Sequence, residues 1–499
     1  MALACLGLAA CTHDDGTQPT AASPGNVLRM AAVGVGPLDP SKLDPSNAAW
    51  VSAVDLLFDG LTGYDESTNA AVPSIASAWS TNDLVTWTFT INPERRFSDG
   101  AAVTAADVVA SLERVATDQT SLSGAQLDIV EGVTALASKT APHASGLVAS
   151  DDHTVKITTR GPYGDLPALL SSPAYGIVEA TSVQPGSLAP RGSGRYTIGS
   201  VEGGTTTLTS ATMPDVQLVS YRDDAAGTAA LSAGQVDWVA HPATMASDAK
   251  PVSGTRDTSF FNGAVITLGM NVHTAALADL RVRQAISQAL DRTAMAAELG
   301  TDVATPWSSL VPPVAHVGGC VAACTGDAAA ARSSVAAVGE LPLLHLDLPD
   351  EPLTKTIGDE VVRQLTAAGI TVQQRIHSDQ EYATLVAANQ QELFVSGAAG
   401  LVPSPDPYLS SAFSSAGTAN LSQLSDPMVD WALNAARATA DPAERRTAYG
   451  KVEDAVFAQA AAVPLVALKS RCETAAGVSD IGSETGRALQ PTKLAFARG

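Results

Sequence analysis

Three residues of the types that bind soft and borderline metal ions recur every four positions late in the chain. They are His316, Cys320 and Cys324, and on a helix this spacing would place one imidazole and two thiols in a single stripe that suits Zn²⁺. Gly318 and Gly319 disfavour a helix here, and thiols in an oxidising compartment tend to form disulfides. We therefore predict no metal site and no cofactor, and Cys320 and Cys324 become candidates for a disulfide.

Catalytic motifs are absent from the sequence. It contains no G-x-S-x-G nucleophile elbow, no H-E-x-x-H zinc motif and no phosphate-binding Walker loop, and its 8 histidines are scattered. Covalent catalysis needs a nucleophile with an adjacent base and a group that orients the base. Since no such set is evident, we expect that the protein is not an enzyme.

Length and charge exclude several classes of protein. A chain of 499 residues is long for one hydrophobic core, so at least two lobes are expected. A net charge of −22 disfavours nucleic acid and anionic membrane surfaces, which both attract basic patches. No apolar run reaches the roughly 18 residues of a membrane span.

The most informative stretch runs from Pro73 to Arg114. Residues 84–91 (LVTWTFTI) are rich in β-branched and aromatic residues and predict a strand. Residues 98–100 (SDG) predict a polar turn with Gly free to adopt positive φ. Thr104, three positions before Asp107, then predicts a capped helix start.

A strand–helix–strand pattern follows in the second half of the chain. Residues 343–348 predict a strand, 353–368 a helix that ends at Gly369, and 370–376 a second strand. A unit of this length implies parallel pairing with a right-handed crossover. Residues 428–440 and 442–461 predict two further helices.

Several phrases closely resemble the signature of family 5 extracellular solute-binding proteins, the peptide, nickel and related receptors of ATP-driven importers. They are VPSIASAW at 72–79, FSDG at 97–100, TAADVV at 104–109 and, later, DLRVRQAISQALDR at 279–292. Further matches extend the resemblance over about residues 26 to 480, nearly the whole chain that follows the N-terminal segment.

The resemblance implies an α/β fold of the type II periplasmic-binding-protein kind, with mixed sheets and a hinged cleft between two lobes joined by crossing strands. Lobe I would comprise residues 26–262 plus 477–499, with a subdomain at about 46–164. Lobe II would comprise residues 263–476.

The same resemblance suggests where a ligand would bind. Asn271, at the end of a crossing strand, is a candidate for lining the cleft, although it equally suits a cap for the following loop. In peptide receptors of this family a loop carries a tryptophan and an Asp that pairs with the α-ammonium of the ligand. Here Pro403 stands at the aligned Asp position, and residues 397–400 (GAAG) contain no tryptophan. Ser404 and Asp406 remain as candidate ligand-binding residues, with a plain turn as the alternative role for Asp406.

The first 25 residues read as an export and anchoring segment. Residues 1–11 end in LAAC, which resembles a bacterial lipobox and would leave Cys11 for lipid attachment. Residues 12–25 are polar and predict a flexible tether. Since this segment is short and lacks a basic region, the true start of the protein is expected upstream. Of the remaining cysteines, Cys320 could form a disulfide with Cys324, or one of these two could pair with Cys472, and the sequence does not decide between these pairings.

These observations lead to a functional expectation. We expect a lipid-anchored, monomeric receptor on the outer face of the cytoplasmic membrane that binds a peptide by hinge closure and delivers it to a separate ABC permease and ATPase. The alternatives are a receptor for a non-peptide solute, such as a metal chelate, haem or an oligosaccharide, and, with less support, a secreted hydrolase.

Overall fold

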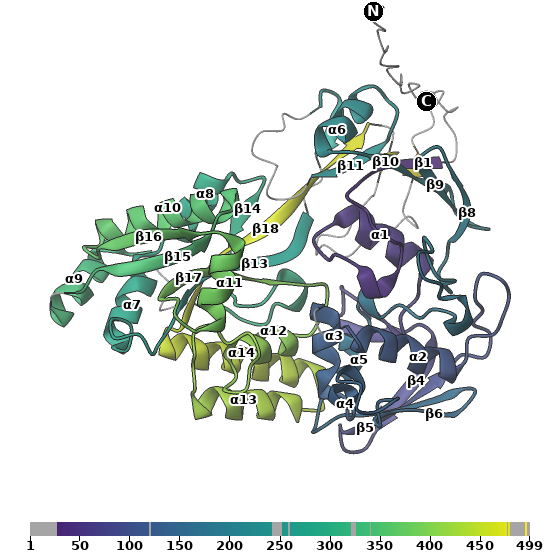
Figure 1. The fold of residues 1–499 in the computed structure, drawn as a ribbon, viewed down its shortest axis with the longest axis horizontal. Helices are drawn as coiled ribbons and strands as arrows, with labels where there is room; N and C mark the ends of the chain where they lie inside the picture. The colour runs from purple at the N-terminus through teal and green to yellow at the C-terminus, as the bar shows by residue number, and fades with distance from the viewer. Residues whose placement is uncertain are drawn as a thin grey trace, which may run out of the picture.

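The computed structural model describes residues 27–118, 121–241, 252–257, 260–320, 326–339, 341–476, 478–479 and 495–496. Within these residues the chain forms two lobes that lie side by side in Figure 1, one from the purple-to-teal residues and one from the green residues. The yellow strand β18 (Ala462–Ala475) runs between them. The predicted two-lobe α/β architecture is therefore confirmed.

Lobe I is built on a sheet whose central strand is the first strand of the described chain. This strand, β1, is parallel to its neighbours β10 and β11, and β9 and β8 continue the sheet beyond β10 in antiparallel order. Helix α1 packs on the face that carries Leu28 and Met30, and α6 packs near Ala31 on the other face. The bounds are β1 (Val27–Val33), α1 (Ala48–Leu57), β8 (Thr197–Glu202), β9 (Thr205–Thr209), β10 (Asp215–Tyr221), α6 (Asp224–Ser232) and β11 (Trp238–His241).

The subdomain contains a four-stranded antiparallel sheet that the informative stretch helps to build. In β5, Trp87, Phe89 and Ile91 are buried and alternate with outward residues, as a half-buried strand requires. The predicted capping box of α2 is confirmed, because Thr104 and Asp107 each accept a hydrogen bond from the backbone N–H of the other. The bounds are β2 (Thr62–Asp65), β3 (Ala70–Pro73), β4 (Ala76–Thr81), β5 (Thr86–Ile91), α2 (Ala105–Ala116), α3 (Leu122–Gln126), α4 (Val133–Ala137), β6 (Leu147–Asp151), β7 (Thr154–Thr158) and α5 (Leu166–Leu169).

Lobe II contains the predicted strand–helix–strand unit. Strands β15 and β16 are parallel, with α10 between them in sequence, and β17 is parallel to β15. β17 also pairs antiparallel with β13. The bounds are β13 (Phe260–Met270), α7 (Leu280–Ala289), α8 (Arg292–Leu299), β14 (Ala304–Pro306), α9 (Ala328–Val338), β15 (Leu344–Pro349), α10 (Pro352–Ala367), β16 (Val372–His377), α11 (Asp379–Ala387), β17 (Leu393–Ala399), α12 (Asp406–Phe413), α13 (Pro427–Arg437) and α14 (Pro442–Gln459).

Strand β18 belongs to the sheets of both lobes. Residues 462–470 pair with β13 of lobe II, whereas residues 471–474 pair with β11 of lobe I. Pro464 lies inside this strand opposite Thr267, where the register with β13 shifts. A proline cannot donate a ladder hydrogen bond, so an irregularity at this position is the arrangement that tolerates it.

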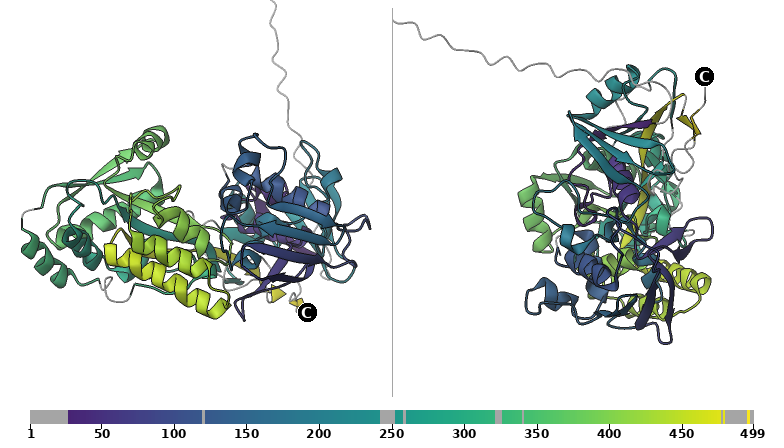
Figure 2. Two further views of the ribbon diagram at one scale, coloured as in Figure 1. Left: turned by 90° about the horizontal axis from the view of Figure 1, so that it is seen from below. Right: turned by 90° about the vertical axis from the view of Figure 1, so that its right-hand side faces the viewer.

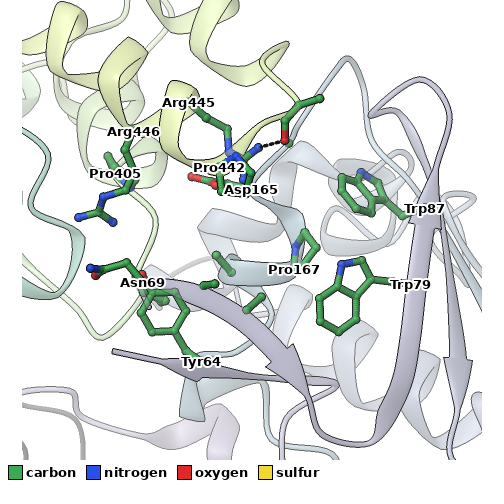
Figure 3. Close-up of a pocket in the computed structure, with 16 residues that line it drawn as sticks. Tyr64, Asn69, Trp79, Trp87, Asp165, Pro167, Pro405, Pro442, Arg445 and Arg446 are labelled. Atoms are coloured by element: carbon green, nitrogen blue, oxygen red, sulfur yellow. Dashed lines mark hydrogen bonds and ion pairs between the residues drawn. The ribbon is translucent and has the colours of Figure 1, made fainter. Parts of the chain in front are cut away.

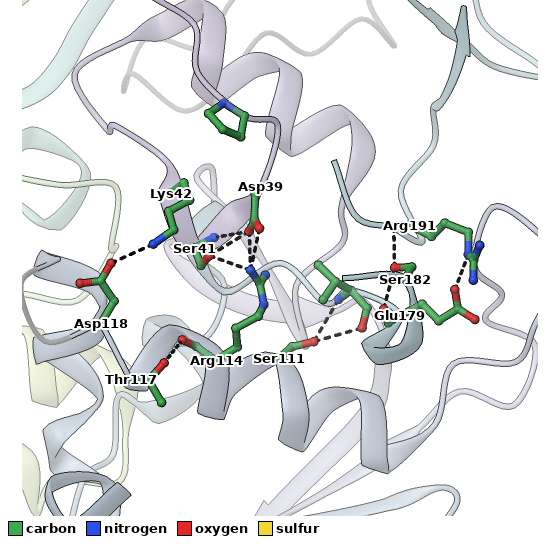
Figure 4. A network of polar contacts seen from close by, with 12 residues as sticks. Asp39, Ser41, Lys42, Ser111, Arg114, Thr117, Asp118, Glu179, Ser182 and Arg191 are labelled. Atoms are coloured by element: carbon green, nitrogen blue, oxygen red, sulfur yellow. Dashed lines mark hydrogen bonds and ion pairs between the residues drawn. The ribbon is translucent and has the colours of Figure 1, made fainter. Parts of the chain in front are cut away.

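The subdomain contacts the two lobes in different ways. Its apolar core forms one continuous cluster with the core of lobe II, whereas lobe I has a separate cluster. Polar contacts join it to lobe I: Arg114 of α2 donates hydrogen bonds to the Asp39 carboxylate and to the Ser41 hydroxyl, both at 2.7 Å (Figure 4). Figure 2 shows the blue subdomain against the yellow-green helices of lobe II. We call this contact, between residues 163–168 and residues 403–446, the seam.

The two cysteines among the described residues differ in their state. Cys320 is disulfide-bonded, and Cys324, its candidate partner, lies outside the described residues, as do Cys11 and the tether. Cys472 is a buried thiol in β18. No helix in the described part of the chain is long and apolar enough to cross a membrane.

Candidate functional site

The loop at residues 400–407 runs through the contact region between the lobes. It follows β17, so it begins at the carboxyl end of a strand that lies parallel to β15, and ligands of α/β proteins commonly bind at such ends. It then enters α12. Residues of this loop line three cavities that also contain residues of the subdomain.

A buried pair of charges crosses the seam. Asp165, just before α5, accepts hydrogen bonds from Arg445 Nε of α14 at 2.6 Å and from the Ser404 hydroxyl at 2.8 Å. All three residues are less than one tenth exposed. The Gly164 backbone N–H also donates to the carbonyl of Arg437 at 2.9 Å. Ser404 is thus fixed at the seam by a carboxylate of the subdomain.

Asp406 is engaged within lobe II. Its carboxylate accepts two hydrogen bonds from Arg437, at 2.6 and 2.9 Å, and one from the Tyr449 hydroxyl at 3.1 Å. Burial lowers the pKa of Arg437, but the charge and the hydrogen bonds of Asp406, together with Tyr163 and Tyr449, outweigh burial and hold this pKa above its ordinary value. Burial, together with Asp406 and Asp165, raises the pKa of the Tyr163 phenol. A ligand ammonium would therefore have to compete with Arg437 for Asp406.

Asn271 lies apart from the other two predicted residues. Its side-chain amide donates to the carbonyls of Asn389 and Gln391 at 3.1 and 3.0 Å, and its oxygen accepts from the backbone N–H of His273 at 3.1 Å. These contacts match the alternative role, a cap for the loop after β13. The structure brings Ser404 and Asp406 together and leaves Asn271 outside the three cavities, so a ligand contact of Asn271 stays a prediction.

The first cavity, which we call the seam cavity, has a volume of about 200 Å³ (Figure 3). The subdomain contributes aromatic residues to it, and lobe II contributes arginines and prolines. Its principal lining residues are Tyr64, Trp79, Trp87, Asp165, Arg445 and Arg446.

The second cavity, which we call the hydroxyl cavity, has a volume of about 220 Å³. Its four charged lining residues form two ion pairs, Asp128 with Arg160 and Asp406 with Arg437. The remaining polar residues carry amides or hydroxyls, namely Gln126, Tyr163, Ser410, Ser411, Ser414 and Thr418. Gln126 also borders the third, much smaller cavity of about 20 Å³, which Leu43 of lobe I and residues 400–402 complete.

Sequence reasoning missed most of the residues that build the seam. Asp165, Arg437 and Tyr163 carry no local signal, and Arg445 and Tyr449 lie in the helix predicted over residues 442–461, where nothing marks them as site residues. The His316–Cys320 segment is irregular rather than helical. Among the described residues, no group of three or more His, Cys, Asp or Glu side chains is arranged to hold a metal ion.

Known proteins share this sequence and this fold. The model of the middle region of bacterial extracellular solute-binding proteins, family 5, matches residues 70–420. The periplasmic murein peptide-binding protein MppA of Escherichia coli is 30% identical over 155 residues, which cover 30% of this chain and 29% of MppA. The match therefore spans less than a third of that relative.

Solved structures extend the likeness to almost the whole chain. The unliganded open form of MppA superposes with a TM-score of 0.81 at 21% identity and covers 95% of this chain and 98% of MppA. NikA from Brucella suis, in complex with Fe(III)-EDTA, superposes with a TM-score of 0.75 at 18% identity and covers 95% of this chain and all of NikA. These likenesses confirm the predicted two-lobe binding-protein fold. Since the family model covers more than half of the chain, the protein belongs to the family 5 bacterial extracellular solute-binding proteins.

Proposed function

We propose that this protein is the receptor of an ABC importer and that it captures a peptide between its lobes by hinge closure. One observation carries the proposal: the loop at 400–407 belongs to lobe II, yet the hydroxyl cavity and the small third cavity, which it lines, also contain described residues of the subdomain. A ligand bound there contacts both bodies and stabilises the arrangement in which both contacts are made. Peptide binding by the relative MppA supports the choice of ligand class.

The size of the cavities fits a receptor that changes shape. The hydroxyl cavity, of about 220 Å³, is smaller than the roughly 300–1,000 Å³ of typical ligand sites. A peptide therefore requires the lobes to move relative to each other. Strands β13 and β18, which link the lobes, are the segments about which such a movement would occur.

Membrane attachment is the second part of the proposal. Lipidation of Cys11 would hold a monomeric receptor on the outer face of the cytoplasmic membrane, close to its permease and ATPase subunits. In cells that express the full-length chain, Cys11→Ala should move the protein from the membrane fraction to the soluble fraction. Unchanged membrane association of the variant would exclude this anchor.

A non-peptide solute is the alternative, and one observation favours it. Every charged side chain that lines the hydroxyl cavity pairs with another lining residue. An uncharged ligand rich in hydroxyls, such as an oligosaccharide, fits this lining without breaking an ion pair.

Native mass spectrometry of the freshly purified protein separates these possibilities. We expect a co-purified peptide, and small-angle scattering should show a smaller radius of gyration once the peptide is added back to stripped protein. A co-purified carbohydrate would replace the peptide proposal by its alternative. Cleavage of the added peptide would overturn the receptor proposal in favour of a hydrolase.

A further inference from the structure

The seam cavity presents a different lining from the region proposed for peptide capture. Its walls come from the β2–β3 hairpin, strands β4 and β5, and α5 on the subdomain side, and from residues 403–446 on the lobe II side. Figure 3 shows Trp79 and Trp87 on one side of the cavity and Arg446 on the other, with Tyr64 and Asn69 below.

Its charges do not cancel. Of the described residues that line the seam cavity, Asp165 is the acid, and Arg445 and Ser404 already occupy both of its carboxylate oxygens. Arg446 is the second cation, and the acceptor of its guanidinium within the described chain is the backbone carbonyl of His316, an uncharged group. The lining therefore carries one excess positive charge, in a protein whose net charge is −22.

The aromatic wall is held rigidly by the subdomain sheet. Trp79 and Trp87 lie on the paired strands β4 and β5, and both pack against Phe89, with ring centroids 6.2 and 6.4 Å apart. The Trp87 indole N–H donates to the Leu84 carbonyl at 3.3 Å. For the Trp79 indole N–H the described residues provide no acceptor. A flat apolar group can stack on this wall at little entropic cost because the indoles are already fixed.

From this juxtaposition we infer that the seam cavity is a second small-molecule site, which binds an organic carboxylate with a flat apolar body. The carboxylate would pair with the Arg446 guanidinium, whose planar fork matches it. The apolar body would lie against Trp79. Pro403, Pro405 and Pro442 add to the wall without presenting an N–H donor.

The surroundings of Arg446 support a net positive charge at this side of the seam cavity. Burial lowers the pKa of the His316 imidazole, and the positive charge of Arg446 lowers it further. Asp441, an acid at the start of α14, does not line the cavity and accepts hydrogen bonds from the backbone N–H groups of Ala443 and Glu444 at 2.9 Å.

Phenylacetate and phenylacetamide are a matched pair of probes, since they differ in charge and hardly in shape. Ligand-observed NMR with the full chain should show that the carboxylate binds at least about fivefold more tightly than the amide, the size of a partly exposed ion pair. Arg446→Gln should abolish that preference and leave the amide affinity unchanged, because Gln can still donate to the His316 carbonyl. Arg446→Lys, which keeps the charge, should retain the preference, and Trp79→Leu should weaken both probes.

A second measurement needs no variant. Salt screens a charge pair near the surface but not an apolar contact, so added NaCl should weaken phenylacetate binding and leave phenylacetamide binding unchanged. An equal affinity for the two probes, a preference that survives Arg446→Gln, or no binding of either probe at about 10 mM, where fragments of this size are normally detected, would overturn the inference.

The site in the seam cavity goes beyond the proposed capture of peptides, and a different experiment tests it. Peptide binding should be unaffected by Arg446→Gln if the two sites are distinct. Failure of all peptides to bind would count against the proposed function, whereas only the probe pair tests the seam cavity.

Discussion

The seam cavity and the hydroxyl cavity have nearly the same volume, and both lie between the subdomain and lobe II. They differ in whether their charged lining residues are paired with one another. The hydroxyl cavity pairs each of its charges internally, Asp128 with Arg160 and Asp406 with Arg437. The seam cavity pairs Asp165 with Arg445 and leaves Arg446 without a carboxylate among the described residues. The ligand charge that a cavity favours therefore depends on which of its side chains are already paired within the protein. It does not follow from the overall net charge of −22.

The largest effect is expected where the seam itself is broken. Asp165→Ala leaves Arg445 buried without its carboxylate, and such a loss typically costs about 3–5 kcal/mol of unfolding free energy. Urea denaturation measures it, with Asp350→Ala as the control because Asp350 and Lys355 form an exposed ion pair. The control should lose less than about 1 kcal/mol. Equal losses for the two variants would show that the seam pair contributes no more than a surface pair.

The next largest effect concerns Asp406. Asp406→Asn removes the negative charge and one of the two oxygens that accept hydrogen bonds from Arg437, whose side chain is 26% exposed and therefore stays partly hydrated. We expect a loss of about 1.5–3 kcal/mol, the range for hydrogen bonds to charged groups. The same denaturation experiment tests this value. If instead stability is unchanged and peptide affinity collapses, Asp406 binds the ligand directly.

The third prediction tests the charge pairing in the hydroxyl cavity through the ligand. Among the described residues that line this cavity no carboxylate is unpaired, so a free α-amine should gain little there. N-acetylation of a bound peptide should weaken its affinity by less than about 1.4 kcal/mol, that is, less than tenfold. Calorimetry on the free and acetylated peptides measures the difference. A hundredfold loss would mean that a carboxylate of the protein does receive the ammonium.

The smallest expected effect also tests the charge pairing in the hydroxyl cavity, at the pair of Asp128 and Arg160. Arg160 and Asp128 are 55% and 40% exposed, so Arg160→Gln should cost less than about 1 kcal/mol of stability. The variant releases Asp128, and a free-amine peptide should then gain up to about fivefold over its acetylated form. An unchanged ratio in the variant would place the amino end of the ligand away from Asp128.

Much of the fold could be predicted because the relevant signals are local. The capping box of α2 lies within four residues, and the β15–α10–β16 unit has clear periodicity and a Gly stop. Strand β18 (Ala462–Ala475) is harder to predict from the sequence. It is buried along most of its length, so it lacks the alternation that marks a half-buried strand, and Pro464 interrupts it.

The site was harder to predict because its partners are distant in sequence. Asp165 and Arg445 are 280 positions apart, and Asp406 and Arg437 are 31 positions apart on different helices. The local sequence around Asp406, which lies between two prolines, is the same whether its carboxylate binds a ligand or an arginine of its own chain. The sequence could therefore nominate Ser404 and Asp406 but not their partners.

The dual membership of β18 also has a consequence for biosynthesis. This strand is the neighbour of β13 in one lobe and of β11 in the other, and it follows the other described strands of both sheets in the chain. During translation both sheets lack an inner strand until it emerges, so neither lobe can close its core early. The nascent polypeptide therefore stays incompletely folded in both lobes until this single strand has been made.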